Sequence, residues 1–271
     1  MESRQLNGDP QGATVRKPYL SVVLPAYDEE ERLGVSLPRI LEYLSTRNWS
    51  FEILVVDDGS SDRTSDVARD RLNGIPHKIL RNDPNRGKGY SVKRGVLEAS
   101  GRYVLFSDTD LSTPIQEVEK LIQALETGAD VAIGSRALKD SRIERHQPWC
   151  REILGKIFNR FLRMLVMRDL HDTQCGFKCF RQEVIQPVFS RQTLDGWAFD
   201  VEVLYVARKL GYHIAEVPVR WINSDVTKVN PLSDGMKMVW DAWRVRRIHA
   251  DLSTPASLQG GRAKKKGSSN D

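Results

Sequence analysis

The sequence predicts an α/β protein built on a mostly parallel β-sheet flanked by helices. Short runs of β-branched and aromatic residues alternate with longer segments of helical periodicity between residues 19 and 135, which is typical of a doubly wound sheet. The short runs are almost continuously apolar, which indicates strands buried on both faces. A chain of 271 residues, 40% hydrophobic and 28% charged, suits one large domain with a sizeable core.

The first half is expected to contain five strands separated by four helices. Pro38 indicates a break or a late start in the first helix, and Ser61 or Asp62 is expected to cap the second. Residues 113–116 form a capping box with proline at the first helical position and begin the fourth helix. The strands are expected at 19–25, 51–57, 77–82, 103–107 and 130–135. The helices are expected at 29–46, from the cap at 61 or 62 to about 72, from the glycine loop at 85–89 to 99, and from 113 to about 127.

The second half is less regular but carries clear amphipathic and apolar runs. Helices are expected at 148–167, 197–210 and 232–249, and strands at 175–180 and 214–221. Residues 1–17 are polar with Gly and Pro, and residues 251–271 are rich in Lys, Gly and Ser. Both ends are therefore predicted to be disordered tails around a domain that spans 18–250.

Composition and charge argue against several classes of protein. No stretch of 18 apolar residues exists, so no transmembrane helix is predicted, and residues 1–17 lack the apolar centre of a signal peptide. Cys150, Cys175 and Cys179 have no second pair to complete a zinc site and are interpreted as reduced thiols. A sequence pI near 9.1 would suit a nucleic-acid-binding protein. Its basic residues are not interleaved with aromatics on strands, however, so no nucleic-acid partner is expected.

The positive charge is concentrated in one segment. Residues 136–168 contain nine Arg or Lys and three acidic residues, a local charge of +6, whereas the whole chain carries +5. The rest of the chain is therefore close to neutral, and a local anion is the simplest reason for the basic segment.

Acidic residues follow two of the predicted strands. Asp57 and Asp58 end one, and Asp108 and Asp110 end another. In an open α/β sheet, ligands bind just beyond the carboxyl ends of the strands, and Mg²⁺ is held by one or two carboxylates together with substrate phosphates. The Asp108-x-Asp110 pair therefore predicts a metal–diphosphate site. Asp is also common in turns, but two clusters at matching strand ends make a plain turn the less favoured interpretation.

An ordered set of motifs between residues 19 and 249 resembles glycosyltransferase family 2, whose members have the GT-A fold. Within that family the set is similar to the polyprenyl-phosphate glycosyltransferases, such as the dolichyl-phosphate β-glucosyltransferases. The first motif usually carries Asn where this chain has Asp28. The segments that carry the resemblance are 25–30, 55–62, 85–89, 107–114, 134–136, 172–178, 196–200 and 217–221.

The resemblance implies an inverting, metal-dependent hexosyltransferase with a nucleotide-binding half (18–136) and an acceptor half (137–250). Mg²⁺ or Mn²⁺ is the expected cofactor, UDP-glucose the expected donor and a polyprenyl phosphate the expected acceptor. The protein is then expected in the cytoplasm, attached peripherally to the cytoplasmic face of a membrane. GDP-mannose as donor, or a soluble or polysaccharide hydroxyl as acceptor, remains the alternative.

The resemblance also assigns residues to the donor site. Asp110 is expected to bind the metal, with Asp108 beside it on the metal or the ribose, and Asp57 to accept a hydrogen bond from uracil. Glu29 and Glu30 also suit a helix first turn, where acids complement the dipole; both interpretations are kept for Glu30, and the nucleotide role is favoured for Glu29. Amides near Lys88 either hold phosphate or form a plain turn. The expected donor-nucleotide residues are Pro25, Ala26, Tyr27, Glu29, Asp57, Lys88, Asp108, Thr109 and Arg220.

The acceptor is expected to be held by arginine. A lipid phosphate is already anionic, so it needs cations rather than a strong base, and Arg136 and Arg151 are the candidates because Arg binds phosphate bidentately. Asp200 corresponds to the base of relatives with hydroxyl acceptors and is here expected to orient groups or support the metal. Asp110, Arg136 and Asp200 are thus the expected catalytic residues, and Lys178 is a candidate for the sugar pocket.

Two of the predicted helices combine an apolar face with a basic rim. They are the segments 151–167 and 232–249, and the second also carries tryptophans next to arginines. Such helices lie at membrane interfaces, although ordinary amphipathic packing explains most of them. We expect these two helices to contact a membrane surface.

Overall fold

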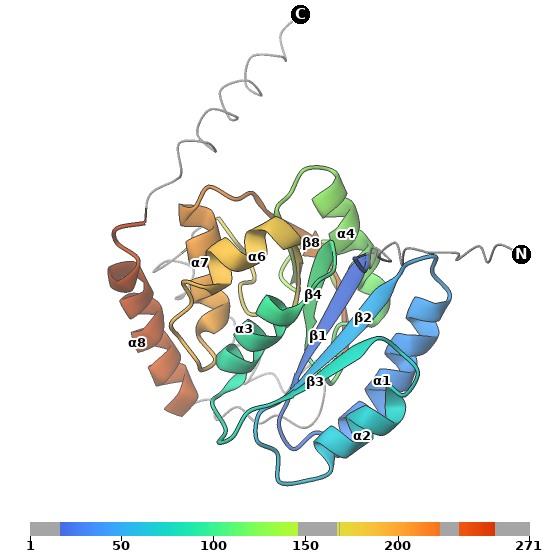
Figure 1. Cartoon of the computed structure of the whole chain (residues 1–271). Helices are drawn as coiled ribbons and strands as arrows, with labels where there is room; N and C mark the ends of the chain where they lie inside the picture. Colours follow the sequence, from blue (N-terminus) through green and yellow to red (C-terminus); the bar gives the residue numbers. More distant parts are fainter. Residues whose placement is uncertain (1–16, 146–166, 168, 223–232, 253–271) are drawn as a thin grey trace, which may run out of the picture.

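The computed structural model describes residues 17–145, 167, 169–222 and 233–252. A mixed sheet of seven strands, in the order β3-β2-β1-β4-β7-β5-β8, lies at the centre of this part of the chain (Figure 1). The expected α/β fold with a mostly parallel sheet is confirmed. The strands are β1 (Leu20–Ala26), β2 (Phe51–Asp57), β3 (His77–Arg81), β4 (Tyr103–Ser107), β5 (Val131–Ser135), β7 (Phe177–Arg181) and β8 (Ile214–Pro218).

The register of the sheet brings the ends of the central strands together. β1 runs parallel to both β2 and β4, with Ala26 paired to Asp57 and Leu20 to Tyr103. β3 is parallel to β2, and β8 is parallel to β5. β7 lies between β4 and β5 and is antiparallel to both, so the segment that precedes Phe177 arrives at the edge where β4 ends.

Helices cover both faces of the sheet. Alternate strand residues point to opposite sides, so that Ile53 and Val55 pack with α1, α2 and α4, whereas Leu54 and Val56 pack with α3, α6 and α7. The helices are α1 (Glu30–Ser45), α2 (Thr64–Arg71), α3 (Lys88–Glu98), the 3₁₀ turn η1 (Ile115–Glu117), α4 (Val118–Glu126), α6 (Gln182–Phe189), α7 (Phe199–Lys209) and α8 (Ser233–Ile248).

Two expectations about helix starts were wrong. Pro38 lies inside a continuous α1, because Leu37 and Ile40 on either side are fully buried and their packing outweighs one missing hydrogen bond. The capping box at 113–116 does not form either. Pro114 has an extended ψ of 143°, a 3₁₀ turn follows it, and the Thr113 hydroxyl faces the Cys175 Sγ at 3.7 Å.

The second half differs more from expectation. The strand expected at 214–221 ends at Pro218, which has no N–H to continue the ladder, and a second strand, β9 (Arg220–Ile222), pairs in parallel with β6 (Arg142–Arg145) as a separate two-stranded sheet. β6 and α6 were not expected. Apart from Met167, the predicted helix at 148–167, which includes Cys150 and Arg151, lies outside the described residues, as do almost all of both tails.

The last helix is confirmed and packs on the body of the domain. α8 lies along α7 at the left edge of Figure 1, where Val245 joins Leu194, Ala198 and Tyr205 in a small apolar cluster. Within the described part of the chain, no helix is both long and apolar enough to cross a membrane.

Candidate active site

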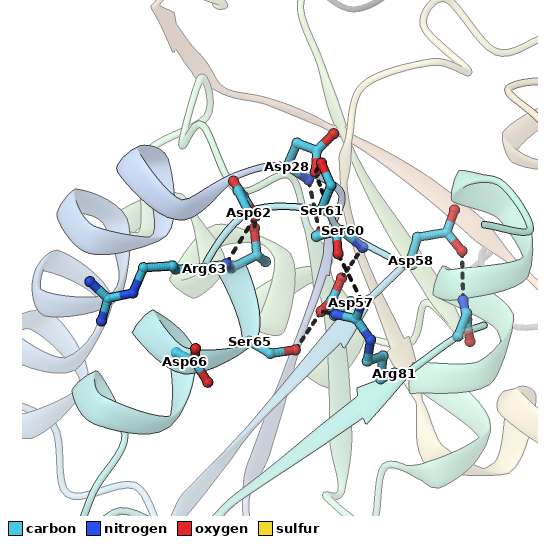
Figure 2. Close-up of polar contacts among 12 residues, drawn as sticks. Asp28, Asp57, Asp58, Ser60, Ser61, Asp62, Arg63, Ser65, Asp66 and Arg81 are labelled. Carbon is cyan, nitrogen blue, oxygen red and sulfur yellow. Dashed lines mark hydrogen bonds and ion pairs between the residues drawn. The ribbon is translucent and has the colours of Figure 1, made fainter. Parts of the chain in front are cut away.

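The carboxylates that end β2 are buried and accept hydrogen bonds from groups of the protein itself (Figure 2). Asp57 is fully buried, and its Oδ1 accepts a hydrogen bond from the Ser60 N–H (2.8 Å), while its Oδ2 accepts from Ser65 and from the Arg81 guanidinium. Burial alone would raise the pKa of Asp57, but the hydrogen bonds from Ser60 and Ser65 and the charge of Arg81 outweigh it and lower the pKa.

Asp58 organises the loop that leads into α3. Its Oδ1 accepts from the Asn82 side chain (2.7 Å) and the Arg86 N–H (3.0 Å), and its Oδ2 accepts from the Gly87 N–H (2.7 Å). The carboxylate is almost fully buried. A buried carboxylate with three donors fixes the backbone around it, so Asp58 holds the start of α3 in place.

The loops after β1 and β2 are joined to each other (Figure 2). The Asp28 N–H donates to the Ser60 hydroxyl (2.9 Å), and the Asp28 carboxylate accepts from the Ser61 N–H (2.7 Å). Asp28 has a φ of 48°, a left-handed conformation that Asn and Asp tolerate better than other residues. The acidic residue in the Asn position of the motif therefore suits this turn.

The expected nucleotide residues of the first motif lie in this joined loop region. Tyr27 is exposed, whereas Ala26 and Glu29 are buried and Pro25 is half-buried. The Glu29 carboxylate pairs with Arg32 (3.0 Å), and its N–H donates to the Thr64 hydroxyl (2.8 Å). Glu29 thus has a local structural role, and Tyr27 is the side chain of this motif that faces solvent.

The carboxylates that end β4 are more open. Asp108 is about one-third exposed (35%), and its Oδ1 lies 2.6 Å from the Lys88 Nζ. Asp110 is half-buried, and its Oδ1 accepts from the Ser112 N–H (2.9 Å). Thr109 between them is buried. Within the described residues, the Asp110 Oδ2 has no hydrogen-bond donor, so this carboxylate retains capacity to bind a ligand.

Gly176 permits the position of Asp108. The Asp108 N–H donates to the Gly176 carbonyl (3.0 Å), and a Cβ on Gly176 would lie only 2.0 Å from the Asp108 Oδ2. Any larger residue would displace the carboxylate. The antiparallel entry of β7 therefore brings a glycine against the acidic end of β4.

Lys88 connects the start of α3 with the end of β4. Its ammonium lies 5.1 Å from the Trp197 ring centroid and 5.5 Å from that of Phe106. Burial would lower the pKa of Lys88, but the charges of Asp108 and Asp200 outweigh it and raise the pKa, so the side chain stays protonated. Three of the amides near Lys88 are bonded within the protein, because Gly89 and Tyr90 donate to the Asp195 carbonyl and Gly87 to Asp58.

Asp200 forms a buried ion pair near this edge. Its Oδ1 lies 2.6 Å from the Lys178 Nζ, which also donates to the Cys175 carbonyl (2.6 Å). Both side chains are nearly inaccessible. Burial raises the pKa of Asp200 despite the charges of Lys178 and Lys88. Lys178 therefore supports Asp200 rather than presenting its ammonium to solvent.

Arg136 is fixed by a second buried carboxylate. Asp172 accepts from the Arg136 N–H (3.0 Å), Nε (2.6 Å) and Nη2 (2.9 Å). Burial would raise the pKa of Asp172, but the charge and hydrogen bonds of Arg136 lower it. The guanidinium lies 5.6 Å from the centre of the Trp221 ring, and the Arg136 side chain is about 30% exposed. Asp172 thus holds this side chain in one orientation.

Arg220 lies at the start of β9, where its Nε is 3.5 Å from Glu144. That Nε is buried and has no hydrogen-bond partner among the described residues. The strand pairing joins Arg220 to Arg142, so the described region after β5 and β8 carries Arg136, Arg142, Arg145 and Arg220.

A divalent cation is compatible with the end of β4, although its ligands would come largely from the substrate. No group of three or more His, Cys, Asp or Glu residues in the described segments could hold a metal. Asp108 and Asp110 supply one or two carboxylates, and Mg²⁺ is commonly bound by that number together with substrate phosphates and water.

Sequence reasoning found the two acidic strand ends but missed their partners. Arg81, the last residue of β3, is half-exposed (49%) and bound to Asp57. Asp172 and Gly176 were seen only as parts of a motif. The expected acceptor residue Arg151 and residues 223–232 lie outside the described residues.

The mixed sheet with acidic residues at the ends of β2 and β4 agrees with the GT-A fold of the glycosyltransferases. This chain belongs to glycosyl transferase family 2, whose sequence pattern matches residues 21–189. It is 37% identical to dolichyl-phosphate β-glucosyltransferase of Dictyostelium discoideum over 84% of this chain and 74% of that protein. The protein of the same name from Drosophila melanogaster is 36% identical (84% and 78%), and that of Homo sapiens 34% (84% and 74%).

Solved structures support the fold. Mannosyl-3-phosphoglycerate synthase from Rubrobacter xylanophilus has a TM-score of 0.64 at 20% identity and covers 90% of this chain and 75% of its own. Glucosyl-3-phosphoglycerate synthase from Mycobacterium tuberculosis, in complex with Mn²⁺, UDP and glucosyl-3-phosphoglycerate, has a TM-score of 0.62 at 20% identity (89% and 82%).

Proposed function

We propose that this glycosyltransferase moves glucose from UDP-glucose to a polyprenyl phosphate with inversion, using Mg²⁺ or Mn²⁺. The observation that carries the proposal is the set of alternating charges at one edge of the sheet. Lys88 pairs with Asp108, Lys178 with Asp200, and Arg136 with Asp172. Such an edge suits a reaction in which two anions, a diphosphate and a phosphate, must lie side by side. The similarity to dolichyl-phosphate β-glucosyltransferases supports it.

The donor would occupy the ends of β1, β2 and β4. The exposed Tyr27 ring would stack on the base, and the half-exposed Arg81 guanidinium, held by Asp57, would offer donors to the base edge. Asp110 and Asp108 would hold the divalent ion, which neutralises the leaving diphosphate when bound. Lys88 and Arg220 would add positive charge beside the same diphosphate, where stabilising developing charge contributes most to catalysis.

The acceptor would bring its own nucleophile. One oxygen of the lipid phosphate attacks the anomeric carbon from the face opposite the UDP, the bond from that carbon to the diphosphate oxygen breaks, and UDP leaves with the electron pair. No proton needs to be removed from an anionic phosphate. Arg136, fixed by Asp172, would orient this phosphate, and Arg151 would assist it. Asp200 would act through Lys178 rather than as a base.

The test is product formation by the full-length protein. Purified protein is incubated with UDP-glucose, Mn²⁺ or Mg²⁺, and a short polyprenyl phosphate, and the lipid is analysed by mass spectrometry. We expect a lipid-phosphate hexose that requires the metal, and none from the matching polyprenol, which lacks the phosphate. GDP-mannose should be a poorer donor. The absence of any lipid-phosphate sugar with all common nucleotide sugars would contradict the proposal.

A soluble hydroxyl acceptor is the second candidate, because the raised pKa of Asp200 suits a general base. Asp200→Asn separates the two. Loss of a true base should reduce turnover by about 10²–10⁴-fold, whereas transfer to a phosphate should fall by about tenfold or less. Steady-state turnover of this variant, compared with wild type at one donor concentration, decides between them.

We also propose peripheral attachment at the cytoplasmic face of a membrane. On α8, Trp240 is exposed and stacks 5.2 Å from Trp243, over which the Arg247 guanidinium lies at 3.8 Å. Trp beside Arg suits the headgroup layer. Trp240→Ser should reduce co-sedimentation with anionic vesicles without changing the melting temperature. Equal vesicle binding by variant and wild type would contradict this role of α8.

A further inference from the structure

A buried carboxylate on α7 holds a loop that has no catalytic group of its own. Glu202 is fully buried, and both of its oxygens lie 3.0 Å from the Thr193 N–H. It also accepts from the Thr193 hydroxyl (2.6 Å) and the Leu194 N–H (2.8 Å). Buried carboxylates are costly unless fully bonded, and Glu202 meets that condition by fixing residues 193–194.

The same carboxylate is tied to the end of α8. The Nε2 of His249 lies 2.7 Å from the Glu202 Oε1, and His249 is itself buried just after the last turn of α8. Because a carboxylate only accepts, the imidazole donates this hydrogen bond. Glu202 therefore joins three segments: α7, the 193–194 loop and the end of α8.

The loop in turn fixes the start of α3. The Asp195 carbonyl accepts from the Gly89 N–H (2.7 Å) and the Tyr90 N–H (3.2 Å), and the Gln192 side chain donates to the Gly89 carbonyl (2.9 Å). A Cβ on Gly89 would lie 2.6 Å from the Leu194 carbonyl oxygen. The two backbones are thus in direct contact, and a shift of the loop must shift the helix start.

Lys88 sits within this contact. Its backbone lies between Gly87, whose Cβ would be 2.6 Å from the Asp195 carbonyl, and Gly89. Its ammonium reaches Asp108 (2.6 Å) and faces the Trp197 ring, which belongs to the segment after the same loop. The place of the Lys88 charge is therefore set by the 192–197 segment.

We propose that Glu202 is a positioning residue for Lys88, and that His249 makes this positioning depend on the packing of α8 against α7. Both side chains are buried and belong to neither of the proposed substrate sites. Glu202 acts through the 193–195 loop and the first turn of α3, and so sets the affinity of the donor site. This inference rests on the proposed role of Lys88 in binding the donor diphosphate.

Glu52 provides a matched control at the opposite end of the sheet. It is also a buried glutamate that accepts from a backbone N–H and hydroxyls, those of Ser100 (2.7 and 2.8 Å) and Ser21 (2.6 Å). It lies near the start of β2, away from the carboxyl ends of the strands. Glu202→Gln and Glu52→Gln should therefore have similar effects on stability, but only the first should affect the donor site.

The experiment is a titration of UDP with Mn²⁺, at a temperature at which every variant is folded by circular dichroism. Glu202→Gln should weaken UDP binding about tenfold, whereas Glu52→Gln should leave it unchanged. His249→Gln, which keeps a donor towards Glu202, should bind UDP more tightly than His249→Ala. In a Lys88→Met background the effect of Glu202→Gln should disappear, because both changes act on one contact.

The outcomes separate this inference from the proposed function. If wild-type protein binds no nucleotide, the proposed function fails and the positioning role fails with it. If wild type binds UDP and Glu202→Gln matches Glu52→Gln, the positioning role alone is overturned. An effect of Glu202→Gln that persists in the Lys88→Met background also overturns it, because Glu202 would then act by another route.

Discussion

The ends of β2 and β4 look alike in sequence and differ in structure. Each ends in a pair of aspartates at the carboxyl edge of the sheet, and each is preceded by an apolar strand. Asp57 and Asp58 are buried and bonded to backbone amides and to Arg81. Asp108 and Asp110 are partly exposed and meet few donors. The same residue type thus builds a scaffold at one strand end and leaves ligand capacity at the next.

The difference comes from the segment after each strand. After β2 the chain turns back through Ser60 and Ser65, whose groups donate to Asp57. After β4 the chain leaves the sheet through Leu111, at a positive φ of 49°, and the Leu111 N–H donates to the Asp108 carbonyl (3.4 Å) rather than to its carboxylate. Hydrogen-bond donors therefore saturate the first pair and not the second. We infer that the first pair contributes to stability and the second to catalysis.

The largest expected effect is at Asp110. Asp110→Asn removes the charge of the carboxylate while keeping its size. Glucosyl transfer should fall by about 10²–10³-fold or more, because stabilisation of the leaving diphosphate is lost. The melting temperature should change little. Initial rates with saturating UDP-glucose measure the effect, and a variant with near wild-type rates would remove Asp110 from the site.

The next effect is at Gly176. In Gly176→Ala the new Cβ would overlap the Asp108 Oδ2 and displace the carboxylate from Lys88. Transfer should fall by about 10–100-fold, since a displacement near 1 Å is costly in a positioned site. Gly34→Ala in α1, where a Cβ meets only Val67 at 4.0 Å, is the control and should keep full activity. Comparable rates for both variants would show that Asp108 tolerates displacement.

For stability the ranking of the two strand ends should be reversed, so that a change at the end of β2 lowers the free energy of unfolding more than a change at the end of β4. Asp58→Asn presents an amide to three donors and should lower the free energy of unfolding by about 1–3 kcal/mol. Asp108→Asn removes a partly exposed ion pair and should change it by about 0.5 kcal/mol or less. Urea denaturation measures both. A larger loss of stability in Asp108→Asn than in Asp58→Asn would contradict the division into scaffold and ligand site.

The smallest effect is a pH dependence of stability at Asp57. Because the folded pKa is lowered, the ionised carboxylate stabilises the protein above its usual pKa of 3.8, and this contribution is lost as pH falls through the lower folded value. Wild type should exceed Asp57→Asn in unfolding free energy by on the order of 1 kcal/mol near neutral pH. The gap should close in acid. A gap that widens below 3.8 would contradict the lowered pKa.

The sequence predicted the first five strands well and the later topology poorly. Runs such as 53–56 and 103–106 are apolar throughout, and this marks buried strands regardless of their neighbours. The antiparallel direction of β7 has no such signal, since side-chain alternation is the same in both directions. The break at Pro218 could have been anticipated, because proline cannot donate within a ladder.

The site was predictable at the level of single residues but not of pairs. Acidic residues after an apolar strand indicated Asp108 and Asp110 from local sequence alone. The partners that decide their state are remote in sequence. Gly176 lies against Asp108 because β7 enters between β4 and β5, and Arg81 meets Asp57 through the pairing of β2 and β3. No local pattern encodes these contacts. The sequence therefore could not show that the carboxylates after β2 are buried and saturated with hydrogen-bond donors whereas those after β4 are not.

The most direct test of the division between the two strand ends is calorimetric titration of UDP, with and without Mn²⁺, on wild type, Asp110→Ala and Asp58→Asn. We predict that Mn²⁺ strengthens UDP binding to wild type and to Asp58→Asn measured while folded, and that Asp110→Ala loses this metal-dependent gain. Metal-dependent UDP binding that survives in Asp110→Ala, or is lost in Asp58→Asn alone, would contradict the assignment of the β4 end as the ligand site.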